Sequence, residues 1–237
     1  MSEPYRANNL LDRVGDAGTR QVHYDQEMRR ERAILDRRLS LEGGDVLSVG
    51  CGLHPGRHLF PRPAFRMTGV DLDEAMIVSL RESGELDDGT VARAGELPYE
   101  PGSFDIVLYR LVLHHVVYQR PLGPVLVEAA RLLRVGGALV AIEPGRWHPV
   151  GGGLALANRL GLGPVVHGTP DDIPISPREL VREARAARLE PELHAVTFGW
   201  RRLPAAAQRA LHPLDGAGSR PRLAPFGHTL MLIARRP

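Results

Sequence analysis

The chain has 237 residues and a formal net charge of +2, and 43% of its residues are hydrophobic, which suits one large globular domain. Its single cysteine excludes an internal disulfide, and its interleaved charges argue against a nucleic-acid interface, which concentrates basic residues on one face. No apolar run approaches the about 20 residues of a membrane helix, and the charged N-terminus is unlike a secretory signal. We therefore expect a cytoplasmic protein that binds neither membranes nor nucleic acid.

The first predicted element is a helix over 24–41, where a narrow stripe of apolar side chains runs among charged ones. Two consecutive glycines, at positions 43 and 44, are expected to stop this helix because glycine is a poor helix former. We interpret residues 1–44 as an N-terminal helical cap that precedes the first strand.

From residue 45 onward, short apolar strands alternate with helices. The predicted strands occupy 45–50, 65–72, 90–94, 104–109 and 138–143. One helix is expected over 73–84, with Asp73 as its N-cap and Gly84 just past its end, and another over 124–133. Such alternation of helices with nearly continuous apolar strands is typical of a parallel sheet that is covered on both faces. The pattern therefore predicts a doubly wound α/β core.

After the fifth strand the sequence becomes rich in glycine and proline. Residues 146–175 and 204–225 are too long for plain connectors, and we predict that they are lid segments. Between the two lids a helix is expected over 176–189, followed by a strand over 193–203. A second strand, over 228–236, is expected to pair with it near the C-terminus.

The helix after the first lid begins with the pattern of a capping box, in which Ser176 is followed three residues later by Glu179. The whole chain is expected to be a single α/β domain with a doubly wound, mostly parallel seven-stranded sheet. Within it, residues 45–145 would form the ligand-binding core. The last helix and the terminal strand pair would come from 176–203 and 226–237.

Two features near the first two strands indicate a ligand site. Gly50 and Gly52 directly follow the first strand, so the backbone there can approach a ligand where a Cβ would collide. Gly56 comes four positions after Gly52, which does not fit the G-x-G-x-x-G spacing of dinucleotide sites. Asp71 closes the second strand, where a carboxylate can bind a ribose diol. Asp71 as a simple turn or cap residue is the alternative, although Asp73 already serves as the cap.

Four segments in this order and spacing, VLSVGCG, TGVDLD, GELPYEPGSFDIVLYRLVLHHV and LLRVGGALVAIEPG, resemble the class I S-adenosylmethionine-dependent methyltransferases. The similarity is to the small-molecule branch, which includes ubiquinone-type and natural-product enzymes. It implies a Rossmann-like methyltransferase fold with S-adenosylmethionine as cofactor. The cofactor contacts that it implies, from methionine and ribose to the adenine edge and the sulfonium end, are Gly50, Cys51, Gly52, Asp71, Leu72, Gly95, Glu96, Arg110 and Leu111.

The chain also departs from the pattern of the family that it resembles. Ser48 stands where these enzymes usually carry an acid that orients the methionine amino group. The usual acid near positions 93–94 is also missing, so only Glu96 could bind the adenine amine. Residues 54–55 lengthen the glycine loop. These departures support an alternative interpretation, a methyltransferase-like ligand-binding or scaffold domain without methyl transfer.

The residues after the fourth and fifth strands are the candidates for chemistry on an acceptor. His115 and His114 could take a proton from a phenol or a carbon acid, because imidazole titrates near neutral pH. Packing or capping by one of the pair is the alternative. Glu143, Trp147 and His148 follow the fifth strand at the edge where open α/β sheets bind ligands, so they are expected to contact the acceptor.

The predicted function is therefore methyl transfer from S-adenosylmethionine to O, N or C of a small molecule, in secondary metabolism. An NAD-dependent oxidoreductase is disfavoured because the glycine spacing is wrong. No metal site is expected, since His58, His194 and His212 match no zinc spacing. The sequence leaves the acceptor, the methylated atom and the oligomeric state open.

Overall fold

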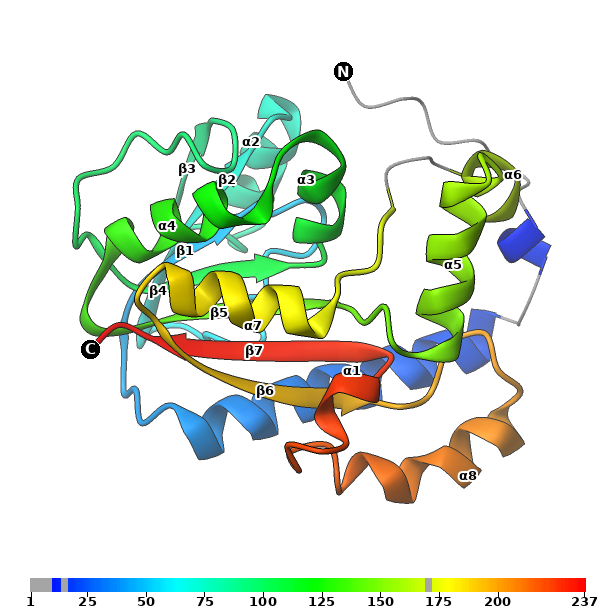
Figure 1. The fold of residues 1–237 in the computed structure, drawn as a ribbon. Helices are drawn as coiled ribbons and strands as arrows, with labels where there is room; N and C mark the ends of the chain where they lie inside the picture. The colour runs from blue at the N-terminus through cyan, green and yellow to red at the C-terminus, as the bar shows by residue number, and fades with distance from the viewer. Residues whose placement is uncertain (1–9, 14–16, 169–171) are drawn as a thin grey trace.

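The computed structural model describes residues 10–13, 17–168 and 172–237. A seven-stranded sheet with the order β3-β2-β1-β4-β5-β7-β6 forms the centre of the molecule (Figure 1). The strands are β1 Gly44–Val49, β2 Phe65–Asp71, β3 Asp88–Val91, β4 Phe104–Arg110, β5 Leu133–Pro144, β6 Glu190–Thr197 and β7 Thr229–Arg235. Only β7 runs antiparallel to its neighbours, β5 and β6. The predicted mostly parallel, seven-stranded sheet is thus confirmed.

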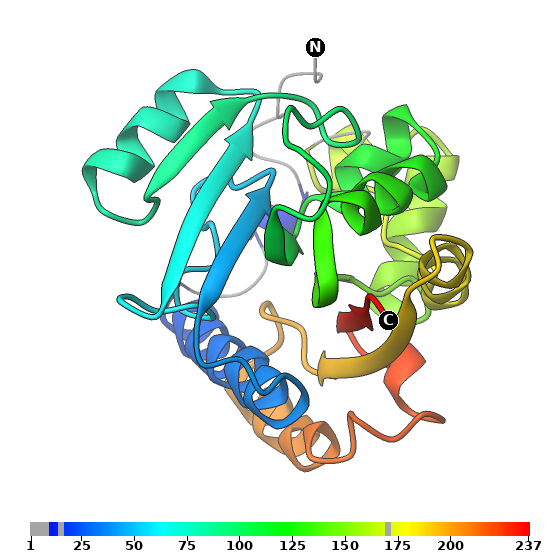
Figure 2. The ribbon, with the colours of Figure 1, turned by 90° about the vertical axis from the view of Figure 1, so that its left-hand side faces the viewer.

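Helices cover both faces of this sheet (Figure 2). The helices are α1 Ala17–Arg38, α2 Glu74–Glu82, α3 Leu113–Gln119, α4 Leu122–Leu132, α5 Pro149–Arg159, α6 Gly163–Val166, α7 Pro177–Ala186 and α8 Ala205–Asp215, with short 3-10 turns at Leu10–Arg13 and Ala224–Phe226. Buried side chains of α1 and α2 pack in one core cluster, and those of α4 and α7 pack in the other. None of the helices in the described part of the chain is long and apolar enough to cross a membrane.

The sheet separates two hydrophobic clusters because neighbouring strand residues point to opposite faces. In β4, Val107 and Tyr109 belong to the cluster under α4 and α7, whereas Ile106 and Leu108 belong to the cluster under α1 and α2. All four are fully buried. Burial on both faces explains why the central strands read as continuous apolar runs in the sequence.

Local capping signals were reliable at one helix and unreliable at another. Asp73 is the N-cap of α2, where its side chain accepts a hydrogen bond from Met76 N, and Gly84 follows the helix with a φ of +78°. The capping box predicted at α7 is wrong in its chemistry. Ser176 occupies the N-cap position, but its side chain makes no capping hydrogen bond.

Several predicted boundaries differ from those of the structure. The first helix begins at Ala17 and ends at Arg38, before the glycine pair. The segments predicted as lids contain the helices α5, α6 and α8, and α3 was not predicted. Helix α8 was not predicted because proline usually breaks helices, and here Pro213 lies inside the helix and Pro204 at its start. The short helix α3 has no side-chain cap of its own, so its first residues carry no local signal.

Candidate functional site

Two neighbouring cavities open at the carboxyl edge of the parallel strands. The first, of about 300 Å³, is here named the β1 cavity, and it brings together six of the predicted site residues, Gly50, Gly52, Asp71, Leu72, Leu111 and His115. The second, of about 400 Å³, is named the α1 cavity because four residues of helix α1 line it. Leu111 and His115 line both cavities, so the two spaces meet at these side chains.

The glycines of the β1 turn are needed for two different reasons. Gly50 has a φ of +64°, and a Cβ there would lie 2.2 Å from Cγ2 of Val112, so protein atoms already fill the space beside it. Gly52 has a φ of +44°, but its nearest heavy atom would be 3.9 Å from an added Cβ. The missing side chain of Gly52 therefore leaves room on the cavity side, which is what close approach of a ligand requires.

Asp71 ties the glycine turn to the end of β2. Its Oδ2 accepts a hydrogen bond from Gly52 N at 2.9 Å, and its Oδ1 accepts bonds from the backbone N–H groups of Leu72 and Asp73 at 2.7 and 3.2 Å. A carboxylate offers about four acceptor positions, so three backbone donors do not saturate it. The side chain can hold the turn and still accept a hydrogen bond from a ligand hydroxyl in the cavity.

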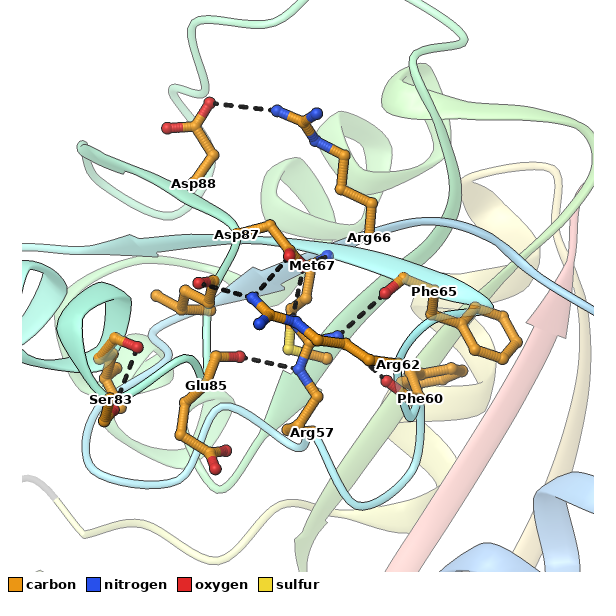
Figure 3. Close-up of polar contacts among 12 residues, drawn as sticks. Arg57, Phe60, Arg62, Phe65, Arg66, Met67, Ser83, Glu85, Asp87 and Asp88 are labelled. Carbon is orange, nitrogen blue, oxygen red and sulfur yellow. Dashed lines mark hydrogen bonds and ion pairs between the residues drawn. The ribbon is translucent and has the colours of Figure 1, made fainter.

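The loop that follows the glycine turn is fixed from two sides. Ser48 is buried, and its hydroxyl donates to the Pro55 carbonyl at 2.9 Å instead of facing the cavity. Arg57 reaches Asp87 at 2.7 Å and also donates to the carbonyls of Glu85 and Phe65 (Figure 3). The additional loop residues are therefore part of an ordered network that leads back to β2 and to the start of β3.

Other predicted cofactor residues lie differently from the expectation. Cys51 is buried in the core cluster below the turn, and burial, with the nearby charge of Asp71, raises its thiol pKa to about 12. Only its backbone faces the turn. Gly95 and Glu96 follow the cavity wall, which residues 92–94 form, and Glu96 pairs with Arg120 of that wall at 3.2 Å.

Arg110 turns away from the β1 cavity toward helix α1. Its Nε and Nη2 donate to the carboxylate of Glu31 at 3.1 and 3.2 Å, and His58 lies 2.9 Å from the same carboxylate. Burial alone would lower the pKa of Arg110, but the charge and hydrogen bonds of Glu31 raise it. For Glu31, burial favours the neutral form, yet the contacts with His58 and Arg110 hold its pKa below the ordinary value. Arg110 thus anchors α1.

Glu143 was expected to contact the acceptor, but its carboxylate lies inside the protein. It is 0% exposed and accepts hydrogen bonds from Val112 N at 3.0 Å and Leu113 N at 2.7 Å, so it caps the start of α3 from strand β5. Its Oε2 lies 2.6 Å from Nδ1 of His114. The His114 ring in turn packs 4.1 Å from the ring of His115.

Neither Trp147 nor His148 lines one of the two cavities, although the ring of His148 packs edge-on against that of His228 with centroids 5.1 Å apart. Trp147 packs against Phe226 with ring centroids 5.7 Å apart, and the guanidinium of Arg178 lies 4.8 Å from its ring. His148 accepts a hydrogen bond from Val150 N at 3.3 Å and caps α5. Among the described residues that line the two cavities, neither side chain is present. The structure does not bring them to the predicted acceptor site.

The α1 cavity contains charged residues that the sequence reasoning missed. His23, Glu27 and Glu31 follow one another at four-residue spacing on one face of α1 and line this cavity. Opposite them lie Arg201 and His228, which come from the other end of the chain. The spacing of the three α1 residues was visible in the sequence, but a polar helix stripe normally indicates a solvated face.

Burial strongly perturbs two of these groups. Burial, together with the neighbouring Glu31, raises the pKa of Glu27 to about 7, while the hydroxyl of Thr229 donates a hydrogen bond to its carboxyl group. Burial and the nearby His148, His23 and Arg201 lower the pKa of His228 well below its ordinary value. Perturbed groups of this kind in a cavity are typical of functional sites.

Comparison with known proteins agrees with this geometry. Residues 47–141 match the family described as a methyltransferase domain. The chain is 34% identical over 167 residues to the ubiquinone biosynthesis O-methyltransferase of Dechloromonas aromatica, an alignment that covers 67% of this chain and 69% of that protein. It is 32% identical over 119 residues to a protein of Mycolicibacterium smegmatis described as a probable S-adenosylmethionine-dependent methyltransferase, covering 49% of this chain and 45% of that protein.

The similarity extends to solved structures. A SAM-dependent methyltransferase from Thermotoga maritima superposes with a TM-score of 0.65 at 18% identity, over 92% of this chain and 91% of that one. Its fold therefore matches nearly the whole chain, whereas the alignment with the mycobacterial relative spans about half of that protein's length. From sequence, fold and turn geometry together, the chain belongs to the S-adenosylmethionine-dependent methyltransferases.

Proposed function

We propose that this protein transfers a methyl group from S-adenosylmethionine to a small polar molecule that binds in the α1 cavity. The observation that carries the proposal is the meeting of the two cavities at Leu111 and His115. One cavity has the open glycine turn and Asp71, and the other has ionisable side chains. A donor and an acceptor bound on either side of this junction would have their reacting groups next to each other.

The residues of the β1 cavity fit the cofactor. Gly52 leaves space where the ligand has to approach the backbone, and Asp71 retains an acceptor position for a ribose hydroxyl. The cofactor supplies a methyl group that is already activated by its positive sulfur. The protein therefore mainly has to align the acceptor and exclude water.

Leu111 has a role in this alignment. It adopts a φ of +56°, which is strained for a leucine, and its backbone N–H is held by the Ile142 carbonyl at 2.8 Å. This conformation places the first residue after β4 where the two cavities join. We propose that Leu111 and His115 shape the passage between donor and acceptor, and that His115 and His114 are the candidates for a base.

The chemistry of the α1 cavity favours a polar acceptor. Glu27 and Glu31 supply carboxyl groups from one side, and from the other side Arg201 supplies N–H donors and His228 an imidazole ring. These groups suit a molecule with several hydrogen-bonding groups better than a hydrocarbon chain. Methyl transfer to O, N or C of the acceptor, and a product that belongs to secondary metabolism, stay predictions. We further propose that α5 and α6 and the segment around α8 enclose the acceptor.

The test has two readouts. Calorimetry with S-adenosylhomocysteine is expected to show saturable binding, and a fractionated small-molecule extract with labelled S-adenosylmethionine is expected to yield a labelled product. Absence of binding would refute the proposal. Binding without transfer to any fraction would favour the alternative, a ligand-binding or scaffold domain, for which the buried Ser48 in place of the usual acid is the supporting observation.

A further inference from the structure

Glu143 holds both the start of α3 and the side chain of His114. Three backbone N–H groups point at its carboxylate, from Val112, Leu113 and His114, at 3.0, 2.7 and 3.4 Å. Both oxygens of this fully buried group accept hydrogen bonds from backbone N–H groups, two at Oε1 and one at Oε2. A carboxylate that accepts on both of its oxygens has no hydrogen to donate.

The protonation of the His114 ring follows from this arrangement. Its Nδ1 lies 2.6 Å from Oε2 of Glu143, so the hydrogen between them has to belong to the imidazole. When the ring is neutral, its single hydrogen is therefore on Nδ1 and its lone pair is on Nε2. The partner of one ring nitrogen thus sets the function of the other.

Nε2 of His114 is on the side of the α1 cavity. His114 lines this cavity, and its Nε2 lies 3.8 Å from Oδ1 of Asp172, which lines the same cavity. Among the residues that the structure describes, the titratable groups around the ring include His115, packed against it, and His167, whose Nδ1 is 3.8 Å from Asp172. The carboxylate that binds Nδ1 is thus on the protein side of the ring, and the basic nitrogen is on the acceptor side.

We propose that Glu143 is a positioning residue that fixes the Nδ1–H tautomer of His114, so that Nε2 receives the proton that the methyl acceptor loses. The acceptor's X–H bond breaks, and its electron pair forms the new bond to the methyl carbon. The electrons of the carbon–sulfur bond stay on sulfur, and the proton moves to Nε2 and then to solvent. This inference rests on the proposed function and narrows the acceptor to one with an acidic hydroxyl or carbon, such as a phenol.

The tautomer can be measured without knowledge of the acceptor. In uniformly ¹⁵N-labelled protein, long-range ¹H–¹⁵N correlation spectra distinguish a protonated from an unprotonated imidazole nitrogen, and H114Q identifies the signals of His114. The wild-type protein is expected to show Nδ1 protonated and Nε2 unprotonated once the ring is neutral. Glu143→Gln is expected to reverse this, because the amide carbonyl can still cap α3 while the amide NH₂ donates to Nδ1 and moves the ring hydrogen to Nε2.

Asp172→Asn is the matched control, since it changes a carboxylate beside Nε2 and leaves Glu143 in place. It is expected to keep the wild-type tautomer. A wild-type protein with its hydrogen on Nε2, or an unchanged tautomer in a folded Glu143→Gln variant, overturns the proposal. If that variant does not fold, the wild-type spectrum alone decides. Calorimetry with S-adenosylhomocysteine is recorded in parallel, so failure of the proposed function is seen separately from failure of this assignment.

Discussion

The two cavities are built in different ways. The β1 cavity comes from a continuous part of the chain between residues 50 and 120, and backbone conformation shapes much of it, with glycines at positive φ and a carboxylate that binds backbone N–H groups. The α1 cavity combines residues as distant as Leu11 and Thr229, and buried charged side chains hold its parts together. The β1 cavity should therefore tolerate changes elsewhere in the protein, whereas the α1 cavity depends on the contacts between its distant segments.

The strongest test of this difference is Glu31→Ala. The buried carboxylate of Glu31 joins α1 to Arg110 and His58, so its removal leaves a buried guanidinium without its partner. Breaking a buried ion pair in this way costs about 3–5 kcal/mol. We expect urea unfolding to show a loss of this size, while the folded protein still binds S-adenosylhomocysteine by calorimetry with nearly unchanged affinity.

The control for this variant is Asp36→Ala on the same helix. Asp36 pairs with Arg32 at i,i+4 spacing, and its side chain is 54% exposed, so its loss is expected to cost only about 0.3–0.5 kcal/mol. If Glu31→Ala weakens cofactor binding as strongly as it destabilises the fold, the two cavities are not independent and the comparison is wrong.

Asp71→Ala tests the other half of the comparison. It removes the acceptor of three backbone hydrogen bonds at the glycine turn together with the group that we expect to bind the ribose. We expect calorimetry to show about 100-fold weaker binding of S-adenosylhomocysteine, which corresponds to the loss of charged hydrogen bonds worth about 2.7 kcal/mol. Asp73→Ala removes only the cap of α2, and should leave the affinity within about threefold while costing about 1 kcal/mol of stability.

The same difference explains which parts of the site can be predicted from the sequence. Alternating strands and helices, the glycines at 50 and 52 and Asp71 are local patterns, and the structure places the predicted residues together at one cavity. Contacts between distant segments have no such pattern. Glu143 was predicted to face the acceptor, because its position after β5 is at the ligand-binding edge, but the N–H groups of α3, about 30 residues earlier, direct it inward. In the same way, Arg110 is drawn to α1 by Glu31.

The acidity of Glu27 gives a further test of the comparison, because we expect the groups of the α1 cavity, and not those of the β1 cavity, to make the free energy of unfolding depend on pH. Burial, then the neighbouring Glu31, raises the pKa of Glu27 from 4.5 to about 7. The native state thus binds the proton more tightly than the unfolded state. Protonation of Glu27 therefore stabilises the folded protein. This stabilisation is complete below about pH 4.5 and is lost as the pH rises to about 7.

Glu27→Gln keeps a neutral group of similar shape that can still accept the hydrogen bond from Thr229. We expect urea unfolding to show that the variant is more stable than the wild type at about pH 8, by on the order of 2 kcal/mol, and that the difference disappears at about pH 4.5. Glu82→Gln, at an exposed position of α2, is the control and should leave the pH dependence unchanged. Parallel curves for wild type and Glu27→Gln would contradict the assignment.

The smallest expected effect separates backbone strain from ligand clash at the glycine turn. Gly52 and Gly136 both have positive φ, +44° and +82°, and an added Cβ meets no protein atom closer than 3.9 Å at Gly52 and none within 4 Å at Gly136. Alanine at either position should therefore cost about 1–2 kcal/mol of stability for the left-handed backbone. Only Gly52 borders the β1 cavity, so only Gly52→Ala should also weaken binding of S-adenosylhomocysteine, by about tenfold or more in calorimetry. Equal affinities of the two variants for S-adenosylhomocysteine would mean that the ligand does not approach the backbone at Gly52. Glycine would then be needed at this position only for its positive φ.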